Sequence, residues 1–193
     1  MSILRATPAL ILPLLLVSMA ARAELREEAN VLSPDGRLAA VLLVQPRAPG
    51  MEERARLEIR DRRDGMLRPV VVPPARSTRI QDSFARVRNP VFAADGEAVY
   101  LLADTGQVPA SVVQRVDLKT GQVRFVIDGT SNDVIRSGRW RGCLLVWRAV
   151  DGINRADVVR SDGTVVLTIP GSETVDGQRE VARWLKAEHA TLG

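Results

Sequence analysis

The residues of this 193-residue chain that could do chemistry are few and widely separated. His189 is the only histidine and Cys143 the only cysteine. A zinc site would therefore have at most one ligand of each kind, and a Ser–His–Asp triad would have to use His189 without the Gly-x-Ser-x-Gly turn of many hydrolases. Cys143 lies in an apolar run, 142–146, which favours a small core residue over a reactive thiol.

Carboxylates are plentiful, so a paired-acid site remains an alternative, but most of the acids occupy turn positions. An aspartate in a tight turn accepts hydrogen bonds from the backbone amides that follow it, which explains these positions without catalysis. The run Asp61-x-x-Asp64-Gly65 lacks the alternating ligands of a calcium loop. We therefore expect no catalytic residue, no metal ligand and no cofactor. The turn acids are Asp35, Asp64, Asp95, Asp117 and Asp162.

The N-terminal segment, 1–23, has the features of an export signal. Arg5 provides a positive start, 9–17 is an apolar run, and the small residues Ala21 and Ala23 stand at the −3 and −1 positions of a cleavage site. The run is too short to cross a bilayer, which takes about 20 apolar residues. We expect cleavage between Ala23 and Glu24, and a periplasmic or secreted mature protein without a transmembrane span.

The mature chain, 24–193, is long enough for a single domain with one good core. The formal charge of +4 falls to about +2 when the two arginines of the signal leave. The remaining charges of both signs are spread along the chain, so we expect no nucleic-acid partner. One cysteine forms no internal disulfide, so packing and hydrogen bonds must hold the fold.

The body of the chain alternates short β-type runs with turn signals. The runs 38–44, 98–103 and 143–147 are almost wholly apolar, which is typical of strands covered on both faces. The run 54–60 alternates strictly, so its charged residues are expected to face water. The Asp-Gly turns before the first two apolar runs favour tight hairpins, because glycine supplies positive φ without steric cost.

These turns recur in a fixed order and define an internal repeat, with units at about 27–73, 87–128 and 132–170. Each unit holds four β-type runs in about 40 residues, which is the period of a propeller blade. The predicted fold class is all-β, a propeller-like array of about three four-stranded antiparallel blades with a C-terminal helix at about 175–189. Trp140 and Trp147 flank the third apolar run and are expected to pack between blades.

A closed propeller has four to eight blades, so an array of three leaves sheet faces uncovered at its ends. Val181, Trp184 and Leu185 share one face of the predicted helix, and we expect them to dock on an end sheet and cap it. Four explanations stay open for the missing blades: a degenerate fourth blade, an open ring, two chains that complete each other, or a shortened descendant of a longer protein.

Two of the turns resemble those of TolB-type β-propeller repeats. The sequence 33–37 (Ser-Pro-Asp-Gly-Arg) is similar to the signature of that family, and 117–121 (Asp-Leu-Lys-Thr-Gly) is similar to the Asp-x-x-Thr-Gly turn that follows it. The resemblance covers roughly 27–170. It implies a periplasmic protein that binds other proteins and needs no cofactor.

Three functions follow from this pattern. The favoured one is an exported, non-catalytic binding module that contacts a protein or cell-envelope component through loops at one end of the blades. The alternatives are a small-ligand protein or carboxylate-based enzyme, and a partial propeller completed by a homo-oligomer. The loops expected to bind are 45–53, 75–89, 104–110 and 128–133. Their densest cationic set could meet an acidic partner or an anionic glycan. This set comprises Arg76, Arg79, Arg86 and Arg88.

Overall fold

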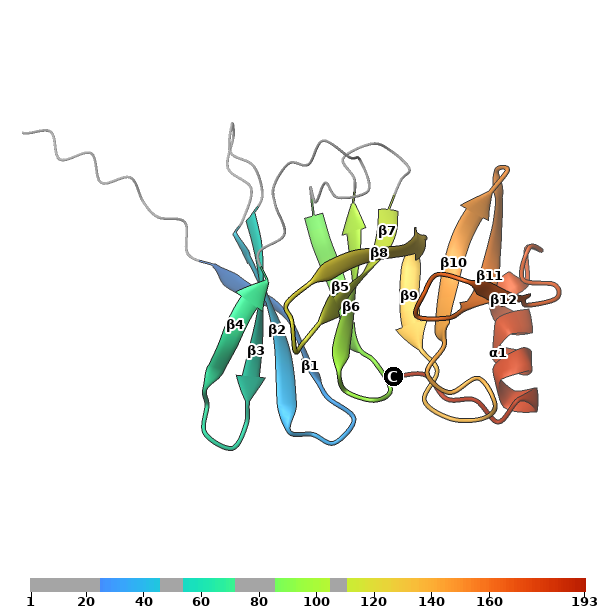
Figure 1. Cartoon of the computed structure of the whole chain (residues 1–193). Helices are drawn as coiled ribbons and strands as arrows, with labels where there is room; N and C mark the ends of the chain where they lie inside the picture. The colour runs from blue at the N-terminus through green and yellow to red at the C-terminus, as the bar shows by residue number, and fades with distance from the viewer. Residues whose placement is uncertain (1–24, 46–53, 72–85, 105–110) are drawn as a thin grey trace, which may run out of the picture.

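The computed structural model describes residues 25–45, 54–71, 86–104 and 111–193. In these residues the chain forms twelve strands, gathered in three sheets, and one helix (Figure 1). The predicted export signal, its cleavage site between Ala23 and Glu24, and most of the first three predicted binding loops lie outside them. No helix among the described residues is long and apolar enough to cross a membrane.

Each sheet has four strands that follow one another along the chain and pair antiparallel. The first sheet holds β1 (Arg26–Leu32), β2 (Leu38–Gln45), β3 (Arg54–Asp61) and β4 (Leu67–Val71). The second holds β5 (Arg86–Phe92), β6 (Ala98–Asp104), β7 (Ser111–Asp117) and β8 (Val123–Asp128). The third holds β9 (Ser131–Val134), β10 (Leu144–Val150), β11 (Ile153–Val159) and β12 (Val165–Thr168). The predicted fold class, an all-β array of three blades, is confirmed.

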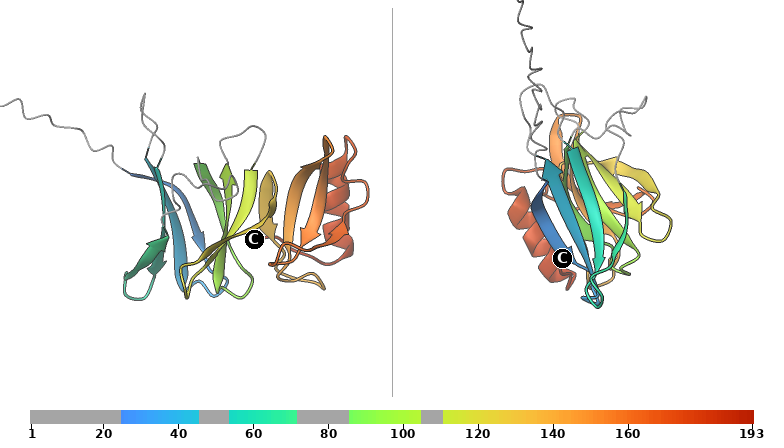
Figure 2. Two further views of the ribbon diagram at one scale, coloured as in Figure 1. Left: turned by 45° about the horizontal axis from the view of Figure 1, so that its top comes forward. Right: turned by 90° about the vertical axis from the view of Figure 1, so that its left-hand side faces the viewer.

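The three sheets stand side by side, with their faces turned toward one another (Figure 2). β5, the first strand of the second sheet, contacts both β1 and β9, the first strands of its neighbours. The first strands are therefore the line along which the sheets meet, as in the inner strands of a propeller.

Alternation along the strands explains why the second sheet holds two hydrophobic layers. On β6, Val99 and Leu101 pack toward the first sheet, with Leu42 and Leu57. Tyr100 and Leu102 point the other way and pack with Val146 and other residues of the third sheet. An apolar run is therefore needed on β6, because both of its faces are buried.

The turns use the residues that the sequence indicates. Gly36 and Gly96 both adopt positive φ, at 68° and 74°. Asp35 accepts a hydrogen bond from the backbone N–H of Arg37 at 3.0 Å. In the second type of turn, hydrogen bonds from the backbone and hydroxyl of Thr120 hold the pKa of Asp117 below its usual value. The turn acids are therefore occupied by local hydrogen bonding.

Helix α1 (Gly177–Ala187) covers the outer face of the third sheet. Val181, Trp184 and Leu185 pack there against a cluster that includes Leu145 and Val158, so the predicted docking is confirmed. The helix is shorter than the expected 175–189. Turn hydrogen bonds occupy the residues before Gly177, and His189 at the other end adopts a left-handed φ of 50°.

The segment after α1 returns along the free edge of β9. Leu192 forms an isolated antiparallel bridge with Ile135, and the backbone N–H of Arg136 donates to the carbonyl of Thr191 at 2.7 Å. Together with α1, this segment covers both the outer face and part of the edge of the third sheet.

Candidate functional site

The two ends of the blades differ in their connections. The short glycine turns at Gly36 and Gly96 lie at the lower end in Figure 1, whereas the turn between β10 and β11, which contains Gly152, lies at the upper end. At the upper end, called the connection end below, β6 finishes at Asp104 and β7 begins at Ser111. The predicted binding loops join the strands at this end, so the described side chains around it form the candidate site.

The first group at the connection end belongs to the second sheet. Nη2 of Arg88 lies 3.2 Å from Oδ1 of Asp104, and it also donates to the hydroxyl of Ser111 at 3.3 Å. That hydroxyl in turn donates to Oδ1 of Asp104 at 2.7 Å. In the ladder, Arg88 stands opposite Leu102, whose side chain faces the third sheet. The Arg88 network therefore lies at the rim of the interface between the second and third sheets.

The second group is centred on Asp157 of β11, whose side chain has no exposed area. Nη1 of Arg148 lies 2.9 Å from its Oδ2, Nε of Arg155 lies 3.3 Å from its Oδ1, and Thr168 donates to Oδ1 at 2.7 Å. We call these four residues the Asp157 cluster. One carboxylate thus orients two guanidinium groups.

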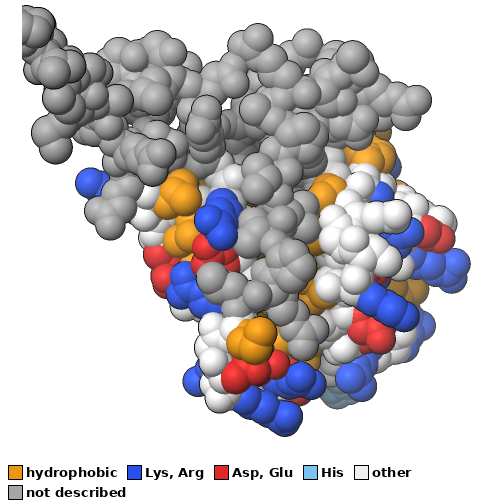
Figure 3. Space-filling view, turned by 60° about the vertical axis from the view of Figure 1, so that its left-hand side comes forward, with side chains coloured by type: hydrophobic (Ala, Val, Ile, Leu, Met, Phe, Trp, Pro, Cys, Tyr) orange, Lys and Arg blue, Asp and Glu red, His pale blue; other side chains and the backbone are white. Residues whose placement is uncertain are grey.

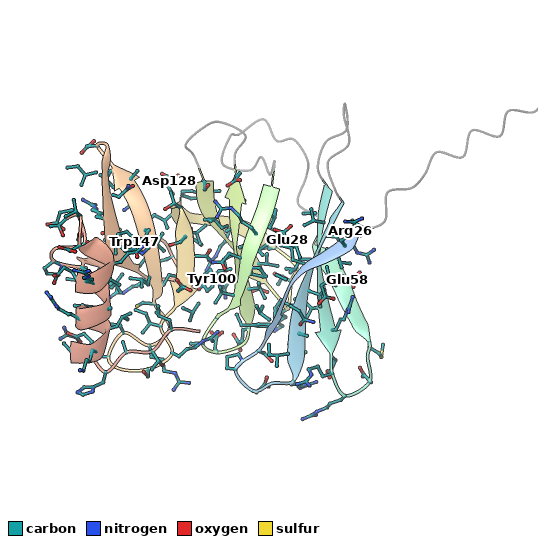
Figure 4. All side chains as sticks on the ribbon, turned by 180° about the vertical axis from the view of Figure 1, so that it is seen from behind. Arg26, Glu28, Glu58, Tyr100, Asp128 and Trp147 are labelled. Carbon is teal, nitrogen blue, oxygen red and sulfur yellow. The ribbon has the colours of Figure 1, made fainter. Side chains whose placement is uncertain are left out.

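Strand register explains why these side chains meet. Asp157 pairs with Val146 and with Thr168, and Arg148 pairs with Arg155, so all of them lie on one face of the third sheet. Val146 belongs to the core shared with the second sheet, which identifies the face. Nε of Arg148 also donates to the carbonyl of Asp128, at the end of β8, at 3.1 Å. Figure 4 shows Asp128 at the connection end, between these sheets.

The arrangement presents guanidinium groups held by carboxylates at the open rim of two packed sheets. A guanidinium offers a planar fork of N–H donors that fits carboxylate or phosphate oxygens. The site is suited to holding an anionic group in place. The described residues contain no group of three histidine, cysteine or acidic side chains placed to hold a metal ion.

Of the four arginines predicted to bind a partner, Arg88 is described in full and forms the ion pair above. Arg86 begins β5, opposite Asp104 in the ladder, but its side chain is outside the described part. Arg76 and Arg79 are also outside it. Sequence reasoning missed Arg148, Arg155 and Asp157. The alternation Arg155-x-Asp157 in a β-type run could have indicated a shared face.

The two reactive side chains considered first lie elsewhere. Cys143 is half-buried beside the cluster under α1, and burial raises the pKa of its thiol. His189 is exposed after the C-terminus of α1, where its backbone carbonyl accepts a hydrogen bond from Ser137 at 2.9 Å. A raised thiol pKa disfavours the thiolate, so this environment does not activate Cys143.

The tryptophans near the third apolar run do not pack between blades, and that expectation is wrong. Trp140 and Trp147 both join the cluster on the outer face of the third sheet. The ring centroid of Trp140 lies 6.3 Å from that of Trp184 on α1. Nε1 of Trp140 donates to Glu188 at 3.2 Å. The helix contributes Val181 and Trp184 to the cluster that these rings join.

The sequence matches no protein-family model, and no curated protein matches it significantly. Solved structures do share its fold. The β-propeller domain of the Trilobed protease from Pyrococcus furiosus, which has an open velcro topology, aligns with a TM-score of 0.54 and 11% identity over 75% of this chain and 42% of that one. The acylaminoacyl peptidase of Pyrococcus horikoshii aligns with a TM-score of 0.53 and 13% identity over 75% of this chain and 25% of that one.

TolB from Acinetobacter baumannii also aligns, at 16% identity over 70% of this chain and 30% of that one, but its TM-score of 0.44 is too low to support a conclusion. The chain spans less than half the length of each of these neighbours. At such identities the alignments establish the fold alone. The protein has a partial β-propeller-like fold of three blades.

Proposed function

We propose that this protein is an exported, non-catalytic binding module whose connection end contacts a protein or another cell-envelope component. The observation that carries the proposal is the set of partly exposed arginines held in fixed positions at that end, Arg88 by Asp104 and Arg155 by Asp157. Ion-paired guanidinium groups lose little side-chain entropy when they bind an anionic surface. The fold supports a binding role, because propellers place function on loops at the ends of their blades.

Two features of the sequence support the proposed location and class of partner. Residues 1–23 have the pattern of a cleavable export signal. The turns at 33–37 and 117–121 resemble those of TolB-type repeats, a family that binds proteins in the periplasm. The described surface in Figure 3 shows acidic and basic side chains intermixed, so recognition would depend on local arrangement and not on one large charged face.

Capture of the partner from envelope extract tests the proposal. The wild-type mature chain is compared with a variant in which Arg76, Arg79, Arg86 and Arg88 are all changed to Gln. The expected result is one enriched envelope component, identified by mass spectrometry, whose recovery falls at least several-fold with the variant. A matched control changes four exposed arginines away from the connection end. These are Arg63, Arg124, Arg141 and Arg160.

Equal recovery with both quadruple variants would exclude the four predicted arginines as the binding surface. Export is tested separately, by N-terminal sequencing of the protein purified from the periplasm or medium. A mature terminus at Glu24 is expected, and an intact Met1 terminus in the cytoplasmic fraction would contradict the proposed location.

A further inference from the structure

We propose that Arg155, held by the buried carboxylate of Asp157, binds a carboxylate of an acidic protein segment at the rim between the second and third sheets. The inference deepens the proposed function by assigning the chemistry of the bound group. It rests on that function for the existence of a partner, although the site itself can be tested without one.

The charge balance of the Asp157 cluster is the first observation. A buried carboxylate needs one cation to be neutralised, and Asp157 has two, Arg148 and Arg155. Hydrogen bonds from Thr168 and Arg148, and the contact with Arg155, already occupy both of its oxygens. The cluster therefore carries one surplus positive charge that its own carboxylate does not require.

The exposure of the two arginines places that surplus on Arg155. The side chain of Arg148 is 17% exposed, and it uses Nε for the carbonyl of Asp128 and Nη1 for Asp157. The side chain of Arg155 is 33% exposed and contacts Asp157 through Nε. Among the described residues, neither terminal amino group of Arg155 has a hydrogen-bond partner, so its outer fork of donors is available to solvent.

The geometry favours a carboxylate as the occupant. The two terminal N–H groups of a guanidinium donate hydrogen bonds to the two oxygens of a carboxylate in one plane. Arg155 is already oriented through Nε, so less conformational entropy is lost on binding than for a free arginine. Arg88, at the same rim, adds a second partly exposed cation from the neighbouring sheet. An acidic peptide that crosses the rim would meet both.

The first sheet provides an internal control for this argument. Glu58 is also a buried acid between two arginines. Nε of Arg56 lies 3.2 Å from its Oε1, and Nη2 of Arg60 lies 3.0 Å from its Oε2. These residues lie on β3, away from the rim between the second and third sheets (Figure 4). Arg56→Gln therefore removes an arginine from a chemically similar cluster at a different place.

The test measures binding of a fluorescent hexaglutamate peptide to the mature chain by anisotropy, at low and physiological salt. Wild type is expected to bind the peptide and to bind a hexalysine peptide much more weakly. Arg155→Gln is expected to weaken hexaglutamate binding at least tenfold, on the order of one lost charge-assisted hydrogen bond. Arg155→Lys, which keeps the charge but not the fork, should give an intermediate loss. Arg56→Gln should change the affinity less than about twofold.

Three results would overturn the inference: no binding of hexaglutamate by wild type, equal losses in Arg155→Gln and Arg56→Gln, or displacement of the peptide by inorganic phosphate at a lower concentration than by glutarate. Melting curves check that each variant is folded, and Arg155→Lys keeps the test decisive if Arg155→Gln does not fold.

Partner capture distinguishes this inference from the proposed function. Capture that survives Arg155→Gln would reject the inference and leave the proposed function standing. If Arg155→Gln loses peptide binding while the quadruple variant still captures the partner, the inference about Arg155 is supported. The four predicted arginines are then excluded as the binding surface.

Discussion

Single carboxylates have two different roles in this molecule, and their burial separates them. Asp35 and Asp117 lie in exposed turns, where they accept hydrogen bonds from the following residues. Asp157 has no exposed area and holds three side chains from three strands. The first role is local and fixes a turn, whereas the second joins strands and orients cations at the candidate site.

Removing the Asp157 carboxylate is expected to be costly. Asp157→Ala leaves two guanidinium groups partly buried without their anion, and we expect a loss of about 3 kcal/mol in the free energy of unfolding. Urea denaturation followed by circular dichroism measures it. The control is Asp104→Ala, whose ion pair with Arg88 is one-third exposed. That change should cost less than about 1 kcal/mol, and equal losses would contradict the distinction.

Two glycines of similar φ give a second residue-level prediction. Gly152 and Gly163 adopt φ values of 78° and 92°. A Cβ on Gly152 would meet nothing within 4 Å, whereas one on Gly163 would collide with the backbone carbonyl of Val126 on β8. Gly152→Ala should therefore cost about 1–2 kcal/mol, for the left-handed backbone alone. Gly163→Ala should cost at least about 1 kcal/mol more, because backbone must move. Thermal denaturation measures the loss of stability in both variants. Equal losses would contradict the close approach of Gly163 to the carbonyl of Val126.

At the level of elements, α1 substitutes for a neighbouring blade. Val181, Trp184 and Leu185 cover residues of the third sheet that a further sheet would otherwise bury. Arg139 strengthens the attachment, since its Nε lies 2.7 Å from Glu188, just beyond the helix. The cap therefore joins the helix, the residue that follows it and the turn between β9 and β10.

Truncating the cap at its largest side chain should destabilise the protein. Trp184 is only partly buried, so Trp184→Ala should cost about 2–3 kcal/mol, below the range for a fully buried tryptophan. Differential scanning calorimetry should show a lower melting temperature. Gln178→Ala, at an exposed position on the same helix, is the control and should leave the melting temperature within about 1–2 °C. No shift in Trp184→Ala would mean that the cap contributes nothing.

The strands were predictable because their signals are local. The apolar runs of β2, β6 and β10 follow from which faces are buried, and the Asp-Gly turns fix the hairpins. The expectation that the charged residues of 54–60 face water is wrong for Glu58, which is buried and paired with Arg56 and Arg60. Helix α1 was also predictable from its periodicity. The placement of Trp140 and Trp147 was not, because the cluster that they join includes Val181 and Trp184 of the helix, more than 30 residues further along the chain. The Asp157 cluster depends on register between three strands, which no single segment reveals.

In the whole molecule, the second sheet is the one enclosed by sheets on both faces. All residues of β6 except Asp104 are buried. Each sheet is stabilised mainly by its neighbours, as in other repeat proteins. The middle of the array should therefore be its most stable part.

Amide hydrogen exchange measures the local stability of the middle sheet relative to that of the outer sheets. The amides of Val99, Tyr100 and Leu101 on β6 should exchange most slowly, since their release requires both inter-sheet layers to open. Amides of β12, an edge strand with partly exposed side chains, should exchange faster. The two strands are compared by mass spectrometry of peptic fragments. Slower exchange in β12 than in β6 would contradict a stabilising role for both neighbours.

The position of α1 also limits how copies of the protein can assemble. Stacked sheets invite head-to-tail addition, in which the last sheet of one molecule meets the first sheet of the next without end. Here the last sheet is already occupied by Val181, Trp184 and Leu185 of its own chain. A growing filament would have to displace this helix at every step, so the docked helix disfavours fibre formation by this route.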